Sequence, residues 1–161
     1  MEAMPRAVTA EATGIEQLYR ADGDRMWRAV FAYAGDREVA SDAVAEAFAQ
    51  AIRRGRAIKD PQKWVWRAAF RIAAGDLSKR RRCPSGQVAQ SYEMETSQEP
   101  NLIAALSKLP AKQRSSLVLH HYAGYSAAEV AAMIGSTSAA VRVHLHRGRA
   151  RMRELLEAGD D

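Results

Sequence analysis

The stretch GYSAAEVAAMIGSTSAAVRVHLHRGRARMR, at residues 124–153, constrains the fold of this chain more than any other segment. Ser126 and Glu129 form a Ser-x-x-Glu capping box, which indicates the start of a helix, and Gly135 is the residue type that ends one. A second helix is predicted after a short turn. Its apolar positions are Val141, Leu145 and Met152, and its cationic face carries Arg142, His146, Arg149 and Arg153. This pattern is typical of a helix-turn-helix that binds in a DNA major groove, although a helical hairpin with a solvated basic face is the alternative for this segment alone.

The charge of the chain is unevenly distributed. Of its 161 residues, with a net charge of +5, residues 1–49 carry −4 and residues 50–82 carry +9. A basic block beside an acidic one suggests two partners, a polyanion for the first and a basic surface for the second. An unevenly charged, solvated surface is the alternative explanation. The hydrophobic content of 47% is sufficient for packed cores and argues against a disordered protein.

Cysteine content and hydropathy exclude several classes of protein. Cys83 is the single cysteine, so an intramolecular disulfide, a CxxC redox pair and a thiolate zinc cluster are excluded. The sequence has neither an apolar run of signal-peptide length at its start nor a stretch approaching transmembrane length. We therefore expect a cytoplasmic protein that does not insert into membranes.

The remainder of the chain is predicted to be all-α, because it has no convincing strand pattern. Residues 1–12 are predicted to be a flexible tail, and residues 13–82 a first helical domain. Three helices are expected in it: residues 14–33, residues 37–54, and a third starting at Asp60-Pro61. The residues expected to be buried are Ile15, Leu18, Tyr19, Met26, Val30, Phe31, Val44, Phe48, Ile52, Trp64, Val65, Ala68, Ile72 and Leu77.

A change of composition divides the chain. Residues 83–100, CPSGQVAQSYEMETSQEP, are polar and lack helical periodicity, so they are predicted to be a flexible linker. Residues 101–161 are predicted to form the second domain, which contains the helix-turn-helix. The fold class is thus all-α, with two small helical domains joined by a flexible linker, which we expect to be tethered but mobile in the free protein.

The order of these motifs resembles the extracytoplasmic-function sigma factors of bacterial RNA polymerase, in the sigma-70 family. IEQLYR, DAVAEAFAQA at residues 42–51 and WVWRAAFRIAAGDLSKRRR at residues 64–82 resemble sigma region 2. LPAKQRSSLVL at residues 109–119, followed by the helix-turn-helix, resembles sigma region 4. The resemblance implies a cytoplasmic subunit that directs core polymerase to promoters. It implies as partners the polymerase core, through its beta-prime coiled coil and beta flap, promoter DNA and an anti-sigma factor.

For the first domain, the resemblance implies two sites. Asp42 and Glu46 match the segment that grips the beta-prime coiled coil, beside a packed Phe48. Residues 53–82 match the segment that recognises and opens the −10 element. There Lys63, Arg67 and Arg71 repeat at helical spacing and form one cationic face for phosphates. We expect Trp66 to be the exposed aromatic and Trp64 to lie in the core. The predicted −10 residues are Arg56, Lys63, Trp66, Arg67, Arg71 and Arg80.

For the second domain, the resemblance implies contact with the −35 element. Arg142 is the candidate for bidentate contact with a guanine edge. Lys112, Arg114 and Arg149 are expected at phosphates. The predicted −35 residues are Lys112, Arg114, Ser138, Ala139, Arg142, His146 and Arg149.

No catalytic constellation competes with this interpretation. The four histidines, His120, His121, His144 and His146, have poor spacing for a shared metal ion, and no nucleotide-binding loop or nucleophile motif is present. We therefore expect no enzyme activity, cofactor or metal. Two other classes stay open: a stand-alone helix-turn-helix regulator that acts without polymerase, and a protein-interaction module that binds an acidic partner.

Overall fold

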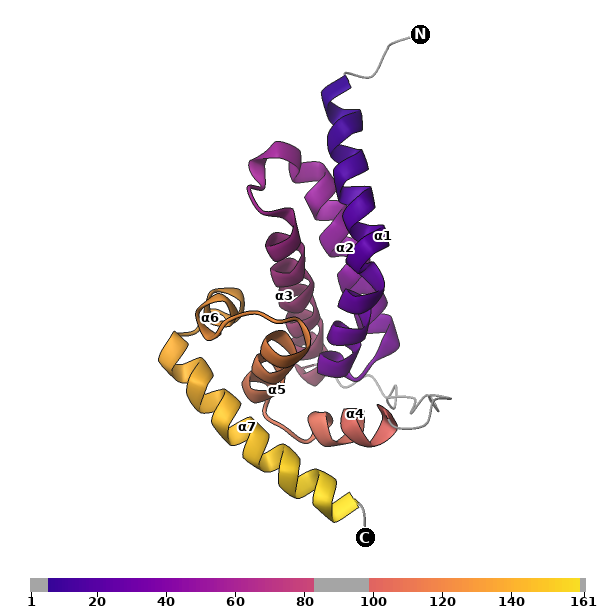
Figure 1. Ribbon diagram of the computed structural model, residues 1–161. Helices are drawn as coiled ribbons and strands as arrows, with labels where there is room; N and C mark the ends of the chain where they lie inside the picture. The colour runs from indigo at the N-terminus through magenta and orange to yellow at the C-terminus, as the bar shows by residue number, and fades with distance from the viewer. Residues whose placement is uncertain (1–5, 83–98, 160–161) are drawn as a thin grey trace.

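The computed structural model describes residues 6–82 and 99–159, and all regular elements within these two ranges are helical (Figure 1). The first unit contains α1 (Arg6–Ala34), α2 (Arg37–Arg54), the short helix η1 (Gly55–Ala57) and α3 (Pro61–Arg82). The second contains α4 (Glu99–Ser107), α5 (Ala111–Leu117), the π-helix η2 (Val118–Tyr122), α6 (Ala127–Ile134) and α7 (Ser138–Gly159). Among these helices, none is both long enough and apolar enough to cross a bilayer.

The turn between α1 and α2 follows from two residues. Gly35 has φ of 69°, a left-handed conformation that ends α1 without steric cost. The side chain of Asp36 then accepts a 3.0 Å hydrogen bond from the backbone N–H of Val39 and caps α2. The predicted bounds of α2 are confirmed.

The beginning of α1 differs from the prediction. A loose tail was expected through residue 12, but α1 already begins at Arg6, because residues 7–12 are mostly Ala and Glu, which favour helix. The expected linker at 83–100 mostly lies outside the described residues, and its last two residues belong to α4.

The core of the first unit lies where α1, α2 and α3 pack together. Its most deeply buried large side chains are Met26, Val30, Val39, Val65 and Trp66. The expectation that Tyr19 and Ile52 lie in the core is wrong, since each is 54% exposed. On α2 the buried stripe continues from Phe48 to Ala51, so Ile52 turns toward solvent.

The second unit packs α7 across α5 and α6. Gly148 of α7 is buried, and a Cβ placed there would lie 3.0 Å from Cδ1 of Leu117 in α5. The missing side chain therefore allows the two helices to approach closely. Val130, Val141 and Leu119 fill the space between α6, α7 and the π-helix.

The two units lie against each other (Figure 1). α1 contacts α4, α5 and η2, and α3 contacts α6. The second unit therefore covers one end of the first, whereas the sequence led us to expect two tethered but mobile domains. The contacts include pairs of polar and aromatic side chains from distant segments, such as Trp66 with Tyr125, which helical periodicity does not predict.

Candidate nucleic-acid interface

The helix-turn-helix is built by local capping. The hydroxyl of Ser126 accepts a 3.1 Å bond from the backbone N–H of Glu129 and donates a 3.2 Å bond to that residue's carboxylate. Gly135 has φ of 67° and ψ of 47°, the expected left-handed cap. Thr137 caps the next helix, because its Oγ1 accepts a 3.1 Å bond from the N–H of Ala140. These short-range bonds position α7 relative to α6.

One face of α7 is open to solvent. Ala139, Arg142, His146 and Arg149 are exposed, and Ser138 is half-buried. The opposite face packs through Val141, Leu145 and Met152, as predicted. Four of the five predicted recognition positions on α7 therefore share an accessible, cationic surface.

His121 lies next to Arg149, at the edge of this surface. Its Nε2 lies 3.4 Å from the guanidinium of Arg149. Partial burial, together with His120 and Arg149, lowers the pKa of His121. At neutral pH the ring is therefore uncharged and does not repel Arg149.

Arg114 makes contacts within the protein. Its Nη1 donates to the carbonyls of Ser107 and Leu109, at 3.4 and 3.2 Å, and its guanidinium lies 5.2 Å from the ring of Tyr33 in α1. In this structure it thus satisfies carbonyls at the end of α4 and contacts the first unit, and its expected contact with DNA phosphates stays a prediction. Lys112 is exposed.

The first unit presents a second cationic face on α3. Lys63, Arg67 and Arg71 are exposed on successive turns, and Arg56 is exposed just before the helix. The ammonium of Lys63 lies 3.3 Å from a carboxylate oxygen of Glu129 in α6. The two units therefore meet at one end of this face.

Of the two tryptophans of α3, Trp66 is more deeply buried than Trp64, the reverse of the order that the sequence predicted. Trp66 is 1% exposed and belongs to the core, so the expectation of an exposed platform is wrong. Trp64 is half-buried, and the guanidinium of Arg54 lies 5.4 Å from its ring. The reason is that α3 is covered on one side by α1 and on another by the turn around Tyr125, whose ring meets that of Trp66 edge-on at 6.0 Å.

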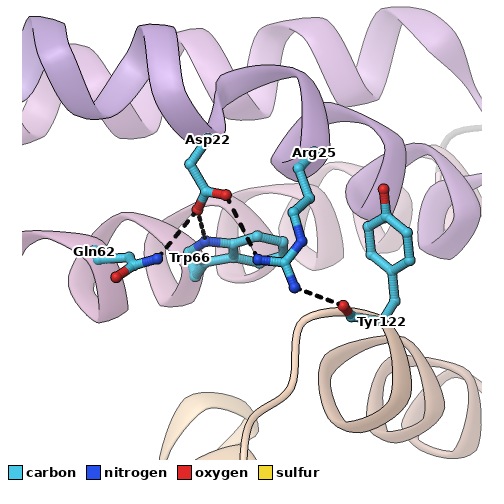
Figure 2. Close-up of polar contacts among 5 residues, drawn as sticks. All are labelled: Asp22, Arg25, Gln62, Trp66 and Tyr122. Carbon is cyan, nitrogen blue, oxygen red and sulfur yellow. Dashed lines mark hydrogen bonds and ion pairs between the residues drawn. The ribbon is translucent and has the colours of Figure 1, made fainter.

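A buried carboxylate organises the junction of the two units (Figure 2). Oδ2 of Asp22 accepts a 2.7 Å bond from Nε1 of Trp66 and a 3.5 Å bond from Gln62. Its Oδ1 lies 3.7 Å from the guanidinium of Arg25. Arg25 in turn donates a 2.8 Å bond to the backbone carbonyl of Tyr122, which belongs to the second unit.

Arg80 lies at the other end of α3, about 25 Å from Lys63 at the rise of an α-helix. Its guanidinium pairs with Asp36 at 2.6 Å and lies 3.9 Å from Glu38. Of the six predicted −10 residues, the structure thus brings Lys63, Arg67 and Arg71 onto one face, with Arg56 at its start. Arg80 is remote from them.

The predicted polymerase-binding residues share the outer side of α2. Asp42 and Glu46 are both exposed, and Phe48 beneath them is buried, as expected. Hydrogen bonds from Gln50 and Arg53, each 3.0 Å, lower the pKa of Glu46. The carboxylate is therefore ionised at neutral pH.

Four functional candidates were missed by reasoning from the sequence: Asp22, Arg25, Tyr122 and Tyr125. One signal was available for Asp22, which occupies the apolar stripe that runs from Leu18 to Met26 at spacings of four. An acidic residue in such a stripe requires a buried partner. The other three depend on tertiary contacts.

Comparison with known proteins agrees with this geometry. The sigma-70 region 4 family model matches residues 100–152, which include the helix-turn-helix. The ECF RNA polymerase sigma factor SigE of Mycolicibacterium smegmatis is 27% identical over 159 residues, covering 88% of this chain. Over most of its length the chain is thus similar to extracytoplasmic-function (ECF) sigma factors of the sigma-70 family. It spans 61% of the length of SigE.

Other ECF sigma factors show the same similarity. SigM of Mycobacterium tuberculosis is 26% identical over 163 residues, covering 96% of this chain and 83% of SigM. The fold matches that of the sigma factor RpoE from Bartonella quintana, solved with the anti-sigma factor NepR. That likeness has a TM-score of 0.76 at 17% identity and covers 88% of this chain and 96% of RpoE. Within the described ranges, no group of three or more His, Cys, Asp and Glu side chains is arranged to hold a metal ion.

Proposed function

We propose that this chain is an ECF sigma factor that binds the core of bacterial RNA polymerase and directs it to specific promoters. The observation that carries the proposal is a pair of exposed cationic faces, one on each helical unit. The face on α3 carries Lys63, Arg67 and Arg71, and the face on α7 carries Arg142, His146 and Arg149. Two separate faces suit two DNA elements that are recognised together.

The α7 face is proposed to read the −35 element. Arg142 projects from the first two turns of the helix, the part of a recognition helix that reaches base edges. Its guanidinium suits the O6 and N7 acceptors of guanine, a pairing worth about 1–3 kcal/mol of discrimination. Ser138, Ala139 and His146 share this face, and Lys112 and Arg149 suit phosphates.

The α3 face is proposed to recognise and open the −10 element. Arg56, Lys63, Arg67 and Arg71 would contact phosphates, which positions the strand without reading its sequence. Trp64 is half-buried beside a cavity of about 370 Å³. It therefore suits the role of stacking against a base, which was expected for Trp66. Base–aromatic stacking of this kind contributes about 1–3 kcal/mol per base.

Asp42 and Glu46 are proposed to bind the polymerase. Two exposed carboxylates on neighbouring turns complement a basic surface, and the family pattern assigns this segment to the beta-prime coiled coil. The second unit would contact the beta flap. Holding both units on the polymerase would convert two weak DNA contacts into one specific interaction. The bound NepR of RpoE supports an anti-sigma factor as a further partner of this chain.

Run-off transcription on a genomic fragment library, with and without the protein, tests the proposal. With bacterial core polymerase we expect discrete start sites that appear only when the protein is present, preceded by two shared sequence elements. Absence of new transcripts, combined with specific DNA binding by the protein alone, would overturn the proposal in favour of a stand-alone regulator.

A further inference from the structure

Arg25 contacts both units through a single side chain (Figure 2). Its Nη2 donates a 2.8 Å bond to the carbonyl of Tyr122, and its guanidinium carbon lies 5.7 Å from the centre of that residue's ring. The same carbon lies 5.8 Å from the ring of Trp66 in α3. The guanidinium thus lies between the core of the first unit and the segment that leaves the π-helix of the second.

Asp22 holds this side chain in place. It lies one helical turn before Arg25, is 7% exposed, and faces the guanidinium at 3.7 Å. Its other oxygen is fixed by the indole N–H of Trp66. A carboxylate fixed in this way restricts the positions that a flexible arginine can take, so less conformational entropy is lost when Arg25 bonds to Tyr122.

The segment held by Arg25 lies beside α6, which contacts one end of the proposed −10 face. Tyr125 packs edge-on against Trp66, and its backbone carbonyl accepts a 2.7 Å bond from Nδ1 of His120, which fixes the turn. In α6, Glu129 pairs with Lys63. The cavity beside Trp64 is lined from both sides, by Lys63 and Arg67 of α3 and by Glu129 and Met133 of α6.

The proposed −35 face is not covered in this arrangement. Arg142, His146 and Arg149 are exposed on the side of α7 away from its packed stripe. Contact between the units therefore engages the Lys63 end of one DNA-binding face and leaves the other face free of such contact. A strand of DNA at Lys63 would have to displace the carboxylate of Glu129, because both compete for one ammonium group.

We propose that Arg25, oriented by Asp22, is a latch that holds the second unit against the Lys63 end of the −10-binding face of α3, beside the cavity at Trp64, in the free protein. Opening the latch frees Lys63 and the cavity beside Trp64 for a DNA strand. This inference rests on the proposed function, since it concerns access to the −10 site. From one hydrogen bond and two cation–π contacts we expect the latch to shift the equilibrium between closed and open forms about tenfold.

The variant Arg25→Ala tests the latch, with Arg20→Ala as the matched control. Arg20 lies on the same helix and pairs with Glu16 at 2.7 Å in an exposed ion pair within α1. Spin labels at Gln17→Cys and Glu157→Cys, in a Cys83→Ser background, report the separation of α1 and α7. We expect a population at longer distance in Arg25→Ala, and the parental distance in Arg20→Ala. The same distance distribution in all proteins would overturn the latch.

Binding of a fluorescent single-stranded 12-mer of random sequence, at low salt, tests what the latch covers. Arg25→Ala removes a positive charge, which by itself weakens DNA binding. We nevertheless expect about tenfold tighter binding, because opening frees Lys63 from Glu129 and opens the cavity beside Trp64, and weaker or equal binding for Arg20→Ala. Weaker binding by Arg25→Ala, with helicity and thermal unfolding like those of the parent, would overturn the proposal.

The variant Glu129→Gln tests the same contact between the units by a change in the second unit. It removes the charge that pairs with Lys63 and keeps the size of the side chain, and we expect longer distances and tighter 12-mer binding here as well. These measurements contain no polymerase or promoter. Failure of the proposed function would appear separately, as absence of polymerase-dependent transcripts from the unmutated protein.

Discussion

The indole N–H of Trp66 donates a 2.7 Å hydrogen bond to the carboxylate of Asp22, which precedes it by 44 residues. Both side chains are buried, so the bond is made away from water. It joins α1 to α3, and the same carboxylate faces Arg25 at the boundary with the second unit. One buried acid thus takes part in the core of the first unit and in its contact with the second.

Replacing this carboxylate should destabilise the protein. Asp22→Ala leaves the N–H of Trp66 buried without a partner, so we expect the free energy of unfolding to fall by about 1–3 kcal/mol. Urea unfolding monitored by tryptophan fluorescence measures the change. Asp24→Ala, an exposed acidic position two residues away, is the control and should change stability by less than about 0.5 kcal/mol. Equal effects of the two variants would contradict a structural role for Asp22.

Two glycines inside helices should respond to alanine in opposite directions. A Cβ at Gly75 of α3 meets no atom within 4 Å, so Gly75→Ala should raise the free energy of unfolding by about 0.5–1 kcal/mol. At Gly148 a Cβ lies 3.0 Å from Leu117, so Gly148→Ala should lower it by about 1 kcal/mol through overpacking. Thermal and urea unfolding of the two variants measure both changes in the free energy of unfolding. Stabilisation by Gly148→Ala would show that α5 and α7 are less closely packed than described.

Arg142→Ala should relax sequence preference at one base pair of the −35 element. The expected loss is about 1–3 kcal/mol of discrimination at that position, with polymerase binding unchanged. Transcription from a promoter library randomised at −35 measures it. Arg151→Ala is the control, because Arg151 lies further along α7 and pairs with Glu154 at 3.0 Å. Loss of preference spread over all positions would indicate a phosphate contact instead of a base contact.

Reversing the two acidic charges on α2 should weaken binding to core polymerase. Asp42→Arg combined with Glu46→Arg places two positive charges against the basic surface proposed for the polymerase, so we expect a lower association rate and lower affinity. Binding of labelled protein to core enzyme measures this. Glu154→Arg with Glu157→Arg, on the last turns of α7, changes the net charge equally and should bind normally. If the α2 variant lost −35 specificity instead, the assignment of roles to the two units would be wrong.

Alkaline pH should destabilise the fold through ionisation of Tyr125. Burial first, and then the carboxylates of Asp22, Asp60 and Glu129, raise the pKa of Tyr125 from 10.0 to about 12. A raised pKa means that the folded state retains a proton that the unfolded state has lost, so this contribution to stability is complete below pH 10 and is lost as the pH rises toward 12. Stability measured across this range should fall less steeply in Tyr125→Phe. Identical slopes would indicate that Tyr125 ionises as freely as in the unfolded chain.

Local features of the fold were accessible from the sequence. The bounds of α2, the Ser126 cap and the left-handed Gly135 depend on interactions within a few residues, and each was predicted correctly. The cationic faces of α3 and α7 follow from helical spacing alone, because side chains three and four apart share a face. Within the described residues, the all-helical fold and the similarity to ECF sigma factors rest on the same kind of local pattern.

The tertiary structure decided the positions that depend on what covers a helix. Trp64 and Trp66 have the same chemistry and lie two residues apart, and only the packing of α1 and Tyr125 determines which one is buried. Arg114 and Arg80 are cationic in the sequence, but their partners, Tyr33 and Asp36, come from distant segments. The sequence by itself thus determined the helices and their charged faces, because these are set by neighbours along the chain. The contact of the two units through Arg25 depends on groups brought together across the fold, so the tertiary structure alone decided it.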